Sequence, residues 1–164
     1  MKKFISALLS VCCLFALTLP ALADEAPPNE KPYTIQIGLE KTEPDLSALP
    51  RRPYYEDGVL MVPLRLIAEG LGYRVGWDAE TGAITVDDDY IQKATLYNGT
   101  AEVVFESHLK AIDMSRTIVN AVPTVIHDGY TYVPLAFFTE FLNDVSEEDG
   151  TILVAPSMCE LAAA

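Results

Sequence analysis

The chain contains an internal repeat with an offset of 71 residues, and this repeat limits the possible folds more than any other feature of the sequence. The run Asp57–Leu71 returns as Asp128–Leu142, with Asp-Gly, Val-Pro-Leu, Glu and Leu in the same places. Seven of the eighteen positions from Tyr54 to Leu71 are identical in the two copies, where unrelated sequences would share about one. We therefore expect the chain to build the same unit twice.

Each copy predicts two strands joined by a tight turn, followed by a helix. Asp-Gly between two apolar runs favours a hairpin turn, because glycine adopts positive φ without steric cost. Pro63 and Pro134 are expected to end the returning strands, 59–62 and 130–133, and to begin the helices, since proline has no N–H for a strand ladder but fits a first helical turn. Helical spacing of apolar residues predicts these core residues: Leu64, Ile67, Leu71, Leu135, Phe138 and Leu142.

Gly72 is placed to close the first helix in a left-handed conformation, and Asn143 to close the second. The repeat resumes at 80–86 and 148–154, where the offset falls to 68 because the second copy lacks three residues. Further strands are predicted at 33–39, 92–96, 101–106, 110–114 and 122–126. The fold class is therefore α+β: a mainly antiparallel sheet packed on two short helices, from two pseudo-repeats of strand-turn-strand-helix-strand near 54–86 and 125–154.

The first copy also resembles a known family. Val62-Pro63-Leu64-Arg65, Glu69-Gly70-Leu71-Gly72 and Val75-Gly76-Trp77-Asp78 are together similar to the copper amine oxidase N-terminal domain-like family, also called stalk domains. The resemblance covers about residues 33–155. It implies a domain of secreted bacterial proteins that holds neither the copper nor the quinone of the oxidase. The second copy departs from the pattern, because Ala136 replaces the arginine, Asn143 replaces a glycine and the Trp-Asp pair is missing.

Both ends of the chain are expected to lie outside the folded domain, 33–156. Residues 1–23 combine lysines, an apolar run and a small-residue site, which is typical of a secretory signal cleaved between Ala23 and Asp24; a retained membrane anchor is the alternative. Residues 24–32 are acidic and proline-rich and indicate a disordered linker, and 157–164 form a tail. After removal of the signal Cys159 is the only cysteine, so no internal disulfide is expected.

The formal net charge of −13 argues against some classes of partner. Nucleic acids and anionic lipids are bound mainly through Lys and Arg contacts to phosphates, so we expect no nucleic acid, and no membrane once the signal is removed. The acidic runs 87–89 and 147–149 lack the glycine and distal glutamate of a calcium loop. They are interpreted as solvated turns, with cation binding as the alternative.

No metal, cofactor or catalytic motif is expected. His108 and His127 are the only histidines, whereas transition-metal sites usually combine two or three with orienting partners. Glu69 and Glu140 occupy equivalent helix positions, so the repeat could bring two carboxylates into one cleft, as hydrolases require. The alternative is that each glutamate binds nearby groups or faces solvent, and a shared concave pocket would distinguish the two.

Aromatic side chains are the remaining candidates for ligand binding. Tyr130 and Tyr132 are expected on one face of their strand, where they would form a stacking platform. Burial is favoured for Trp77, with ligand contact as the alternative, and at least one of Tyr54 and Tyr55 should be exposed because adjacent strand residues face opposite ways. The sequence therefore predicts a non-catalytic secreted module of the bacterial cell envelope, either a spacer or a binder of cell-wall glycan or surface protein. A hydrolase using Glu69 and Glu140 is the alternative.

Overall fold

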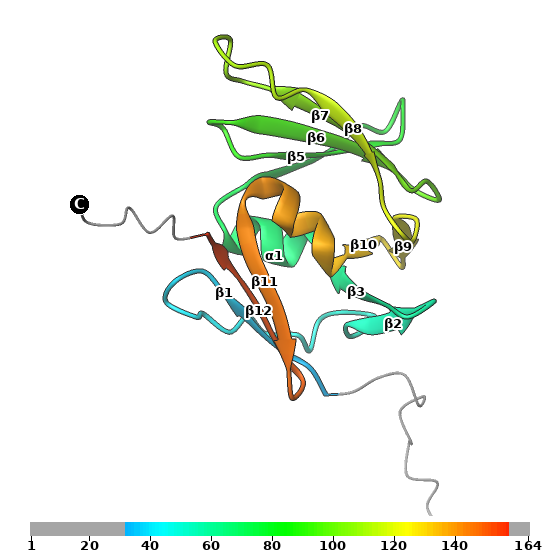
Figure 1. Ribbon diagram of the computed structural model, residues 1–164. Coiled ribbons are helices and arrows are strands. Elements are labelled where there is room, and N and C mark those ends of the chain that lie inside the picture. Colours follow the sequence, from blue (N-terminus) through cyan, green and yellow to red (C-terminus); the bar gives the residue numbers. More distant parts are fainter. Residues whose placement is uncertain (1–31, 158–164) are drawn as a thin grey trace, which may run out of the picture.

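The computed structural model describes residues 32–157. These residues form twelve strands and two short helices (Figure 1). The expected signal with its Ala23–Asp24 cleavage site, nearly all of the linker, and Cys159 with most of the tail lie outside the described residues. Within 32–157, neither helix is long and apolar enough to cross a membrane.

The strands are divided among three sheets. The first has the order β1 (Thr34–Ile37), β12 (Thr151–Pro156), β11 (Asn143–Glu148), with β1 parallel to β12 and β11 antiparallel to it. The second, all antiparallel, has the order β2 (Tyr54–Glu56), β3 (Val59–Pro63), β10 (Tyr130–Pro134), β9 (Val125–His127). The third, also antiparallel, has the order β4 (Arg74–Trp77), β5 (Ala83–Asp87), β6 (Gln92–Tyr97), β7 (Glu102–Ser107), β8 (Arg116–Val119). The α+β class is confirmed, with three sheets where one was expected.

The two copies produce the same order of elements. The first gives β2, β3, α1 (Leu64–Gly70), β4 and β5, and the second gives β9, β10, the 3-10 helix η1 (Leu135–Phe141), β11 and β12. The Asp-Gly turns have positive φ at both residues, 48° and 79° at Asp57-Gly58 and 47° and 84° at Asp128-Gly129. This is the type I′ geometry that matches the twist of a hairpin.

The copies meet in the second sheet through β3 and β10. Val62 lies opposite Val133, and these are the same position of the repeat. Because the strands are antiparallel, this pair lies on a local two-fold axis that relates the copies.

Both helices lie between the first and third sheets (Figure 1), and all three sheets contribute to the main core. Leu64 and Ile67 of α1 and Phe138 of η1 are fully buried as predicted, and Leu71 and Leu135 are partly buried against the same cluster. Complete burial of such a side chain contributes about 1.5–3 kcal/mol. The helices are therefore stabilised mainly by packing, because each is only seven residues long.

The end of the second helix differs from the prediction. Leu142, predicted to be core, is 52% exposed, because its φ of 58° turns it away from the helix. Asn143, predicted to take the left-handed conformation, is buried as the first residue of β11, and its side-chain amide donates to the carbonyls of Phe138 and Phe141 at 3.1 and 3.2 Å. Gly72, in contrast, has the predicted positive φ, 87°.

Two further predictions about strands were wrong. Residues 110–114 form no strand; the strand begins at Arg116, after a turn in which Asp113 Oδ1 accepts a hydrogen bond from the Ser115 N–H at 2.9 Å. The segment predicted at 122–126 is β9, which covers only Val125–His127.

Candidate functional site

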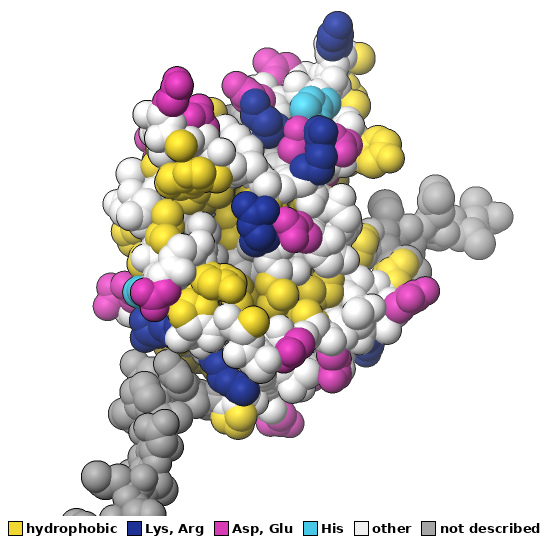
Figure 2. Space-filling model, turned by 180° about the vertical axis from the view of Figure 1, so that it is seen from behind, with side chains coloured by type: hydrophobic (Ala, Val, Ile, Leu, Met, Phe, Trp, Pro, Cys, Tyr) yellow, Lys and Arg dark blue, Asp and Glu magenta, His cyan; other side chains and the backbone are white. Residues whose placement is uncertain are grey.

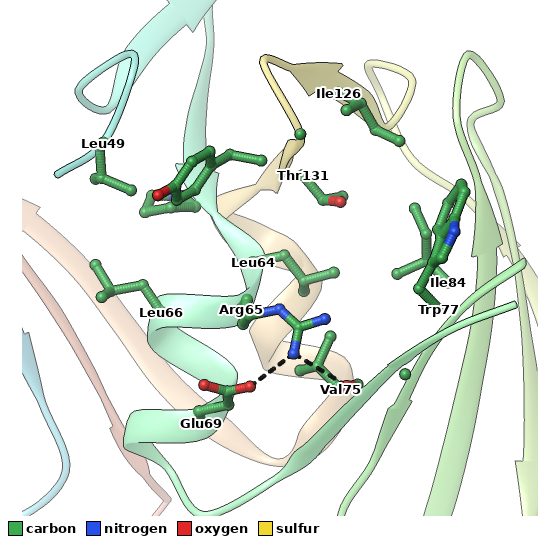
Figure 3. Close-up of a pocket in the computed structure, with 14 residues that line it drawn as sticks. Leu49, Leu64, Arg65, Leu66, Glu69, Val75, Trp77, Ile84, Ile126 and Thr131 are labelled. Carbon is green, nitrogen blue, oxygen red and sulfur yellow. Dashed lines mark hydrogen bonds and ion pairs between the residues drawn. The ribbon is translucent and has the colours of Figure 1, made fainter. Parts of the chain in front are cut away.

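A groove with a volume of about 640 Å³ lies between α1, β4 and the β9–β10 hairpin (Figure 3). In the close-up, Leu49 and Leu66 stand on one side, Trp77 and Ile84 stand on the other, and the Arg65 side chain lies between them. Most side chains that line the groove are apolar. On the face shown in Figure 2, apolar side chains form connected areas and the basic side chains stand singly or against acidic ones. The groove is thus suited to apolar groups of a ligand.

Two exposed aromatic side chains line the groove from different copies of the repeat. Trp77, the last residue of β4, is 54% exposed, and Tyr130, the first residue of β10, is 40% exposed. The favoured burial of Trp77 was wrong because β4 is the outermost strand of its sheet, with a neighbour on one side only. The alternative, an accessible indole, is the one that the structure shows.

The platform predicted from Tyr130 and Tyr132 does not exist. Tyr132 is fully buried: its hydroxyl donates to the carbonyl of Arg51, and its ring lies 5.6 Å from that of Tyr54. The segment before β2 therefore covers it, while Tyr130 beside the hairpin turn stays accessible. Tyr54 is also buried and Tyr55 is 36% exposed, so at least one of this pair is exposed as expected.

The two glutamates of the hydrolase alternative do not share a pocket. Glu69 lines the groove and forms an ion pair with Arg65 at 2.8 Å, whereas Glu140 is absent from the groove lining. The Glu140 carboxylate binds Arg116 instead, at 2.8 Å from Nη2 and 3.3 Å from Nε. Each carboxylate is thus neutralised separately, and the paired acid and base that glycoside hydrolysis requires are not formed.

The acidic run 87–89 forms the turn between β5 and β6. Asp87, Asp88 and His108 have potential ligand atoms within 4.8 Å of one another, but these atoms already serve the turn. Asp88 Oδ1 accepts three backbone N–H groups, and Asp87 binds His108 Nε2 at 2.9 Å. Although partial burial raises the pKa of Asp87, the hydrogen bonds from the Asp89 N–H and His108, together with the Arg74 charge, lower it overall.

Sequence reasoning missed several groove residues. Arg65 was noticed only as part of the family pattern, and Leu49 lies outside the predicted strands and helices. Leu66 offered a usable clue, because it is an apolar residue outside the apolar stripe of its helix. Leu66 is partly buried against the core cluster and also lines the groove.

Comparisons with known proteins agree with the resemblance seen in the sequence. The family model described as "Copper amine oxidase N-terminal domain" matches residues 45–154. A protein named "Protease inhibitor" from Brevibacillus choshinensis is 34% identical over 104 residues, which is 63% of this chain and 29% of that protein. This chain therefore spans less than a third of the length of that relative. No solved structure matches the chain significantly.

Proposed function

The chain belongs to the copper amine oxidase N-terminal domain family, whose domain is non-catalytic, and we propose that it is a secreted binding module of the bacterial cell envelope. Its ligand lies in the groove between α1, β4 and the β9–β10 hairpin. The family match at 45–154 includes every residue that lines this groove. Export rests on the secretory pattern of residues 1–23.

The accessible indole of Trp77 carries this proposal. Burial of a large apolar side chain contributes about 1.5–3 kcal/mol, and Trp77 forgoes much of this contribution by remaining 54% exposed in a concave site. Tyr130 adds a second accessible ring, and most of the lining side chains are apolar, as in most ligand sites of proteins. Aromatic rings at such sites recover their burial energy when a ligand covers them.

The groove supports binding rather than chemistry. Its charged side chains are Arg65 and Glu69, which are paired with each other, and its lining holds no serine, cysteine, histidine or aspartate. A Ser–His or Cys–His pair is therefore absent from this lining. The partial similarity to a protein named a protease inhibitor also supports a binding role, because inhibition of a protease is an act of binding.

Sedimentation with purified bacterial cell envelope, with surface proteins retained, tests the proposal. We expect the protein to co-sediment, and Trp77→Ala combined with Tyr130→Ala to abolish co-sedimentation. Tyr97→Ala is the matched control, because Tyr97 is 41% exposed and lies outside the groove lining. The control should bind like wild type.

Three results would contradict groove binding. In the first, a chelator abolishes co-sedimentation while the Trp77 and Tyr130 variant still binds. The protein would then bind the envelope through cations at the acidic turns and not through the groove. Equal loss in the Tyr97 control would indicate a nonspecific surface effect. If no variant and no condition gives co-sedimentation, the spacer alternative stands, in which the domain recognises nothing.

A further inference from the structure

We propose that the ligand is an extended peptide segment of another protein, which adds to the free edge of β4 as an extra strand and places apolar side chains in the groove. This inference rests on the proposed function of the groove as a binding site. Three features support it: the direction of the β4 backbone groups, the chemistry of the lining, and the charge around it.

The β4 backbone presents a free edge to the groove. The N–H of Asp78, just after β4, donates to the carbonyl of Ala83 at 2.9 Å. Because backbone groups alternate along a strand, Gly76 also points its N–H and C=O toward β5, while Val75 and Trp77 point theirs away. Val75, Gly76 and Trp77 all line the groove, so the groups that point away from β5 face the ligand site.

Arg65 confirms this direction. Its guanidinium donates to the Val75 carbonyl at 3.2 Å, and to Glu69 at 2.8 Å. The arginine thus occupies the place of one N–H group of an adjacent strand. In the described part of the chain, no backbone group of a turn, loop or cap hydrogen-bonds to the Trp77 backbone. An added strand would pair at Trp77 and end at Arg65.

The lining suits a peptide better than a glycan. A sugar presents many hydroxyl groups, and its sites supply polar side chains to match them. Here the polar side chains are Thr131, Tyr130 and the Arg65–Glu69 pair, and the remaining side chains are apolar. A strand presents every second side chain to one face, so one face of an added strand would meet these apolar groups while its backbone binds β4.

The charge around the groove indicates which peptides fit. The protein has a net charge of −13, and two exposed acidic residues, Asp78 and Asp128, directly adjoin lining residues in the sequence. Hydrogen bonds from the backbone N–H of Glu80 and from Thr81 lower the pKa of Asp78, so this carboxyl is ionised at neutral pH. Lysine or arginine at the outward positions of the peptide would complement this charge. The expected partner segment alternates apolar with basic residues.

Selection from a displayed library of random dodecapeptides tests the proposal on the secreted form of the protein. Peptides are selected on wild type and counter-selected on Trp77→Ala. We expect enriched sequences that alternate apolar and basic or neutral residues. A synthetic peptide of the enriched sequence should shift the amide and indole NMR signals of Trp77.

Backbone methylation of this peptide tests strand addition itself. N-methylation of one residue at a time should weaken binding by about tenfold at the position whose N–H binds the Trp77 carbonyl. Methylation at the two neighbouring positions, whose N–H groups point away from β4, is the matched control and should have little effect. Equal effects at all three positions would overturn strand addition, and equal binding to Trp77→Ala would overturn its place in the groove.

The remaining outcomes separate this inference from the proposed function. If no peptide is enriched but chitohexaose shifts the signals of Trp77 and Tyr130, the ligand is a glycan; the peptide inference fails and groove binding stands. If peptides, chitohexaose and cell envelope all leave these signals unchanged, both the inference and the proposed function fail.

Discussion

Beside the helix of the first copy lies an open, mostly apolar groove, whereas at the equivalent place beside the helix of the second copy a tyrosine and a glutamate side chain meet. The strand pairings identify the equivalent positions. Trp77 lies opposite Ile84, and Glu147 lies opposite Ile152, which is the same position of the second copy. Glu147 of the second copy is therefore equivalent to Trp77 of the first, and by the 71-residue offset Tyr55 of the first copy is equivalent to Ile126 of the second.

These replacements make the place equivalent to the groove more polar. The hydroxyl of Tyr55 donates to Glu147 Oε2 at 3.5 Å, so the two side chains meet. Tyr33 lies beside them, and burial together with the proximity of Tyr55 and Glu147 raises the pKa of Tyr33 to about 12. One backbone arrangement thus carries either an exposed indole or a glutamate in contact with a tyrosine, depending on a few side chains.

The largest expected effect tests whether the copies share one core. Ile67 and Phe138 are equivalent positions, and both are fully buried. Ile67→Ala and Phe138→Ala should lower the free energy of unfolding by about 2–5 and 3–5 kcal/mol respectively. Urea unfolding should remain a single transition in both variants. Thr139→Ala, an exposed neighbour, should cost less than about 1 kcal/mol; two separate transitions would contradict the shared core.

The equivalent glutamates should differ in their contribution to stability. Glu140→Gln should cost about 1–3 kcal/mol, because it leaves the half-buried Arg116 without its charged partner. Glu69→Gln should change stability by less than about 0.5 kcal/mol, since its pair with Arg65 is exposed. Urea unfolding at neutral pH measures both. If both variants lose the same stability, the Glu140–Arg116 pair stabilises the fold no more than the exposed Glu69–Arg65 pair does.

The two helix ends provide a smaller contrast. Gly72 has a φ of 87°, and a Cβ there would meet no neighbouring atom, so Gly72→Ala should cost about 1–2 kcal/mol through the backbone alone. Leu142 already adopts a positive φ as a non-glycine residue. Leu142→Ala should therefore cost under about 1 kcal/mol, mostly from lost contact area. Thermal unfolding measures the stability of both variants. A larger loss of stability in Leu142→Ala than in Gly72→Ala would contradict this ranking of the two helix ends.

The smallest effect on stability is expected in the groove itself. Trp77→Glu installs the residue of the second copy at the equivalent position of the first. It should change the free energy of unfolding by less than about 0.5 kcal/mol, because the side chain is more than half exposed. The same variant should lose co-sedimentation with cell envelope. A large loss of stability would show that Trp77 has a structural role.

The features that the sequence predicted depend on residues close together along the chain. The Asp-Gly turns, the helix starts after Pro63 and Pro134, and the closing Gly72 follow from local backbone preferences. The position of Leu142 did not follow from local backbone preferences. The second copy has a shortened link to β11, and the helix ends there for that reason. The parallel pairing of β1 with β12 joins segments more than a hundred residues apart, and no local pattern indicates it.

The candidate site shows the same limit. The sequence identified Trp77 and Tyr130 as candidates, and the structure places both in the groove. It could not show that Arg51 and Tyr54 cover Tyr132, or that Tyr55 contacts Glu147. Exposure of an aromatic side chain depends on what the rest of the chain packs over it, which a strand pattern alone does not contain.

The pairing of β1 with β12 also determines how the domain responds to mechanical force. Thr34 lies beside Thr151 and Ile37 beside Val154, so the described chain enters this sheet at one end and leaves it at the other. Tension between these two points slides the strands past each other and stretches all their evenly spaced hydrogen bonds together. Rupture in this shear geometry needs the bonds to fail at once, whereas peeling would break them singly. A protein anchored at a cell surface and pulled by its partner would transmit that tension through this strand pair, and its lifetime under force would follow its unfolding rate.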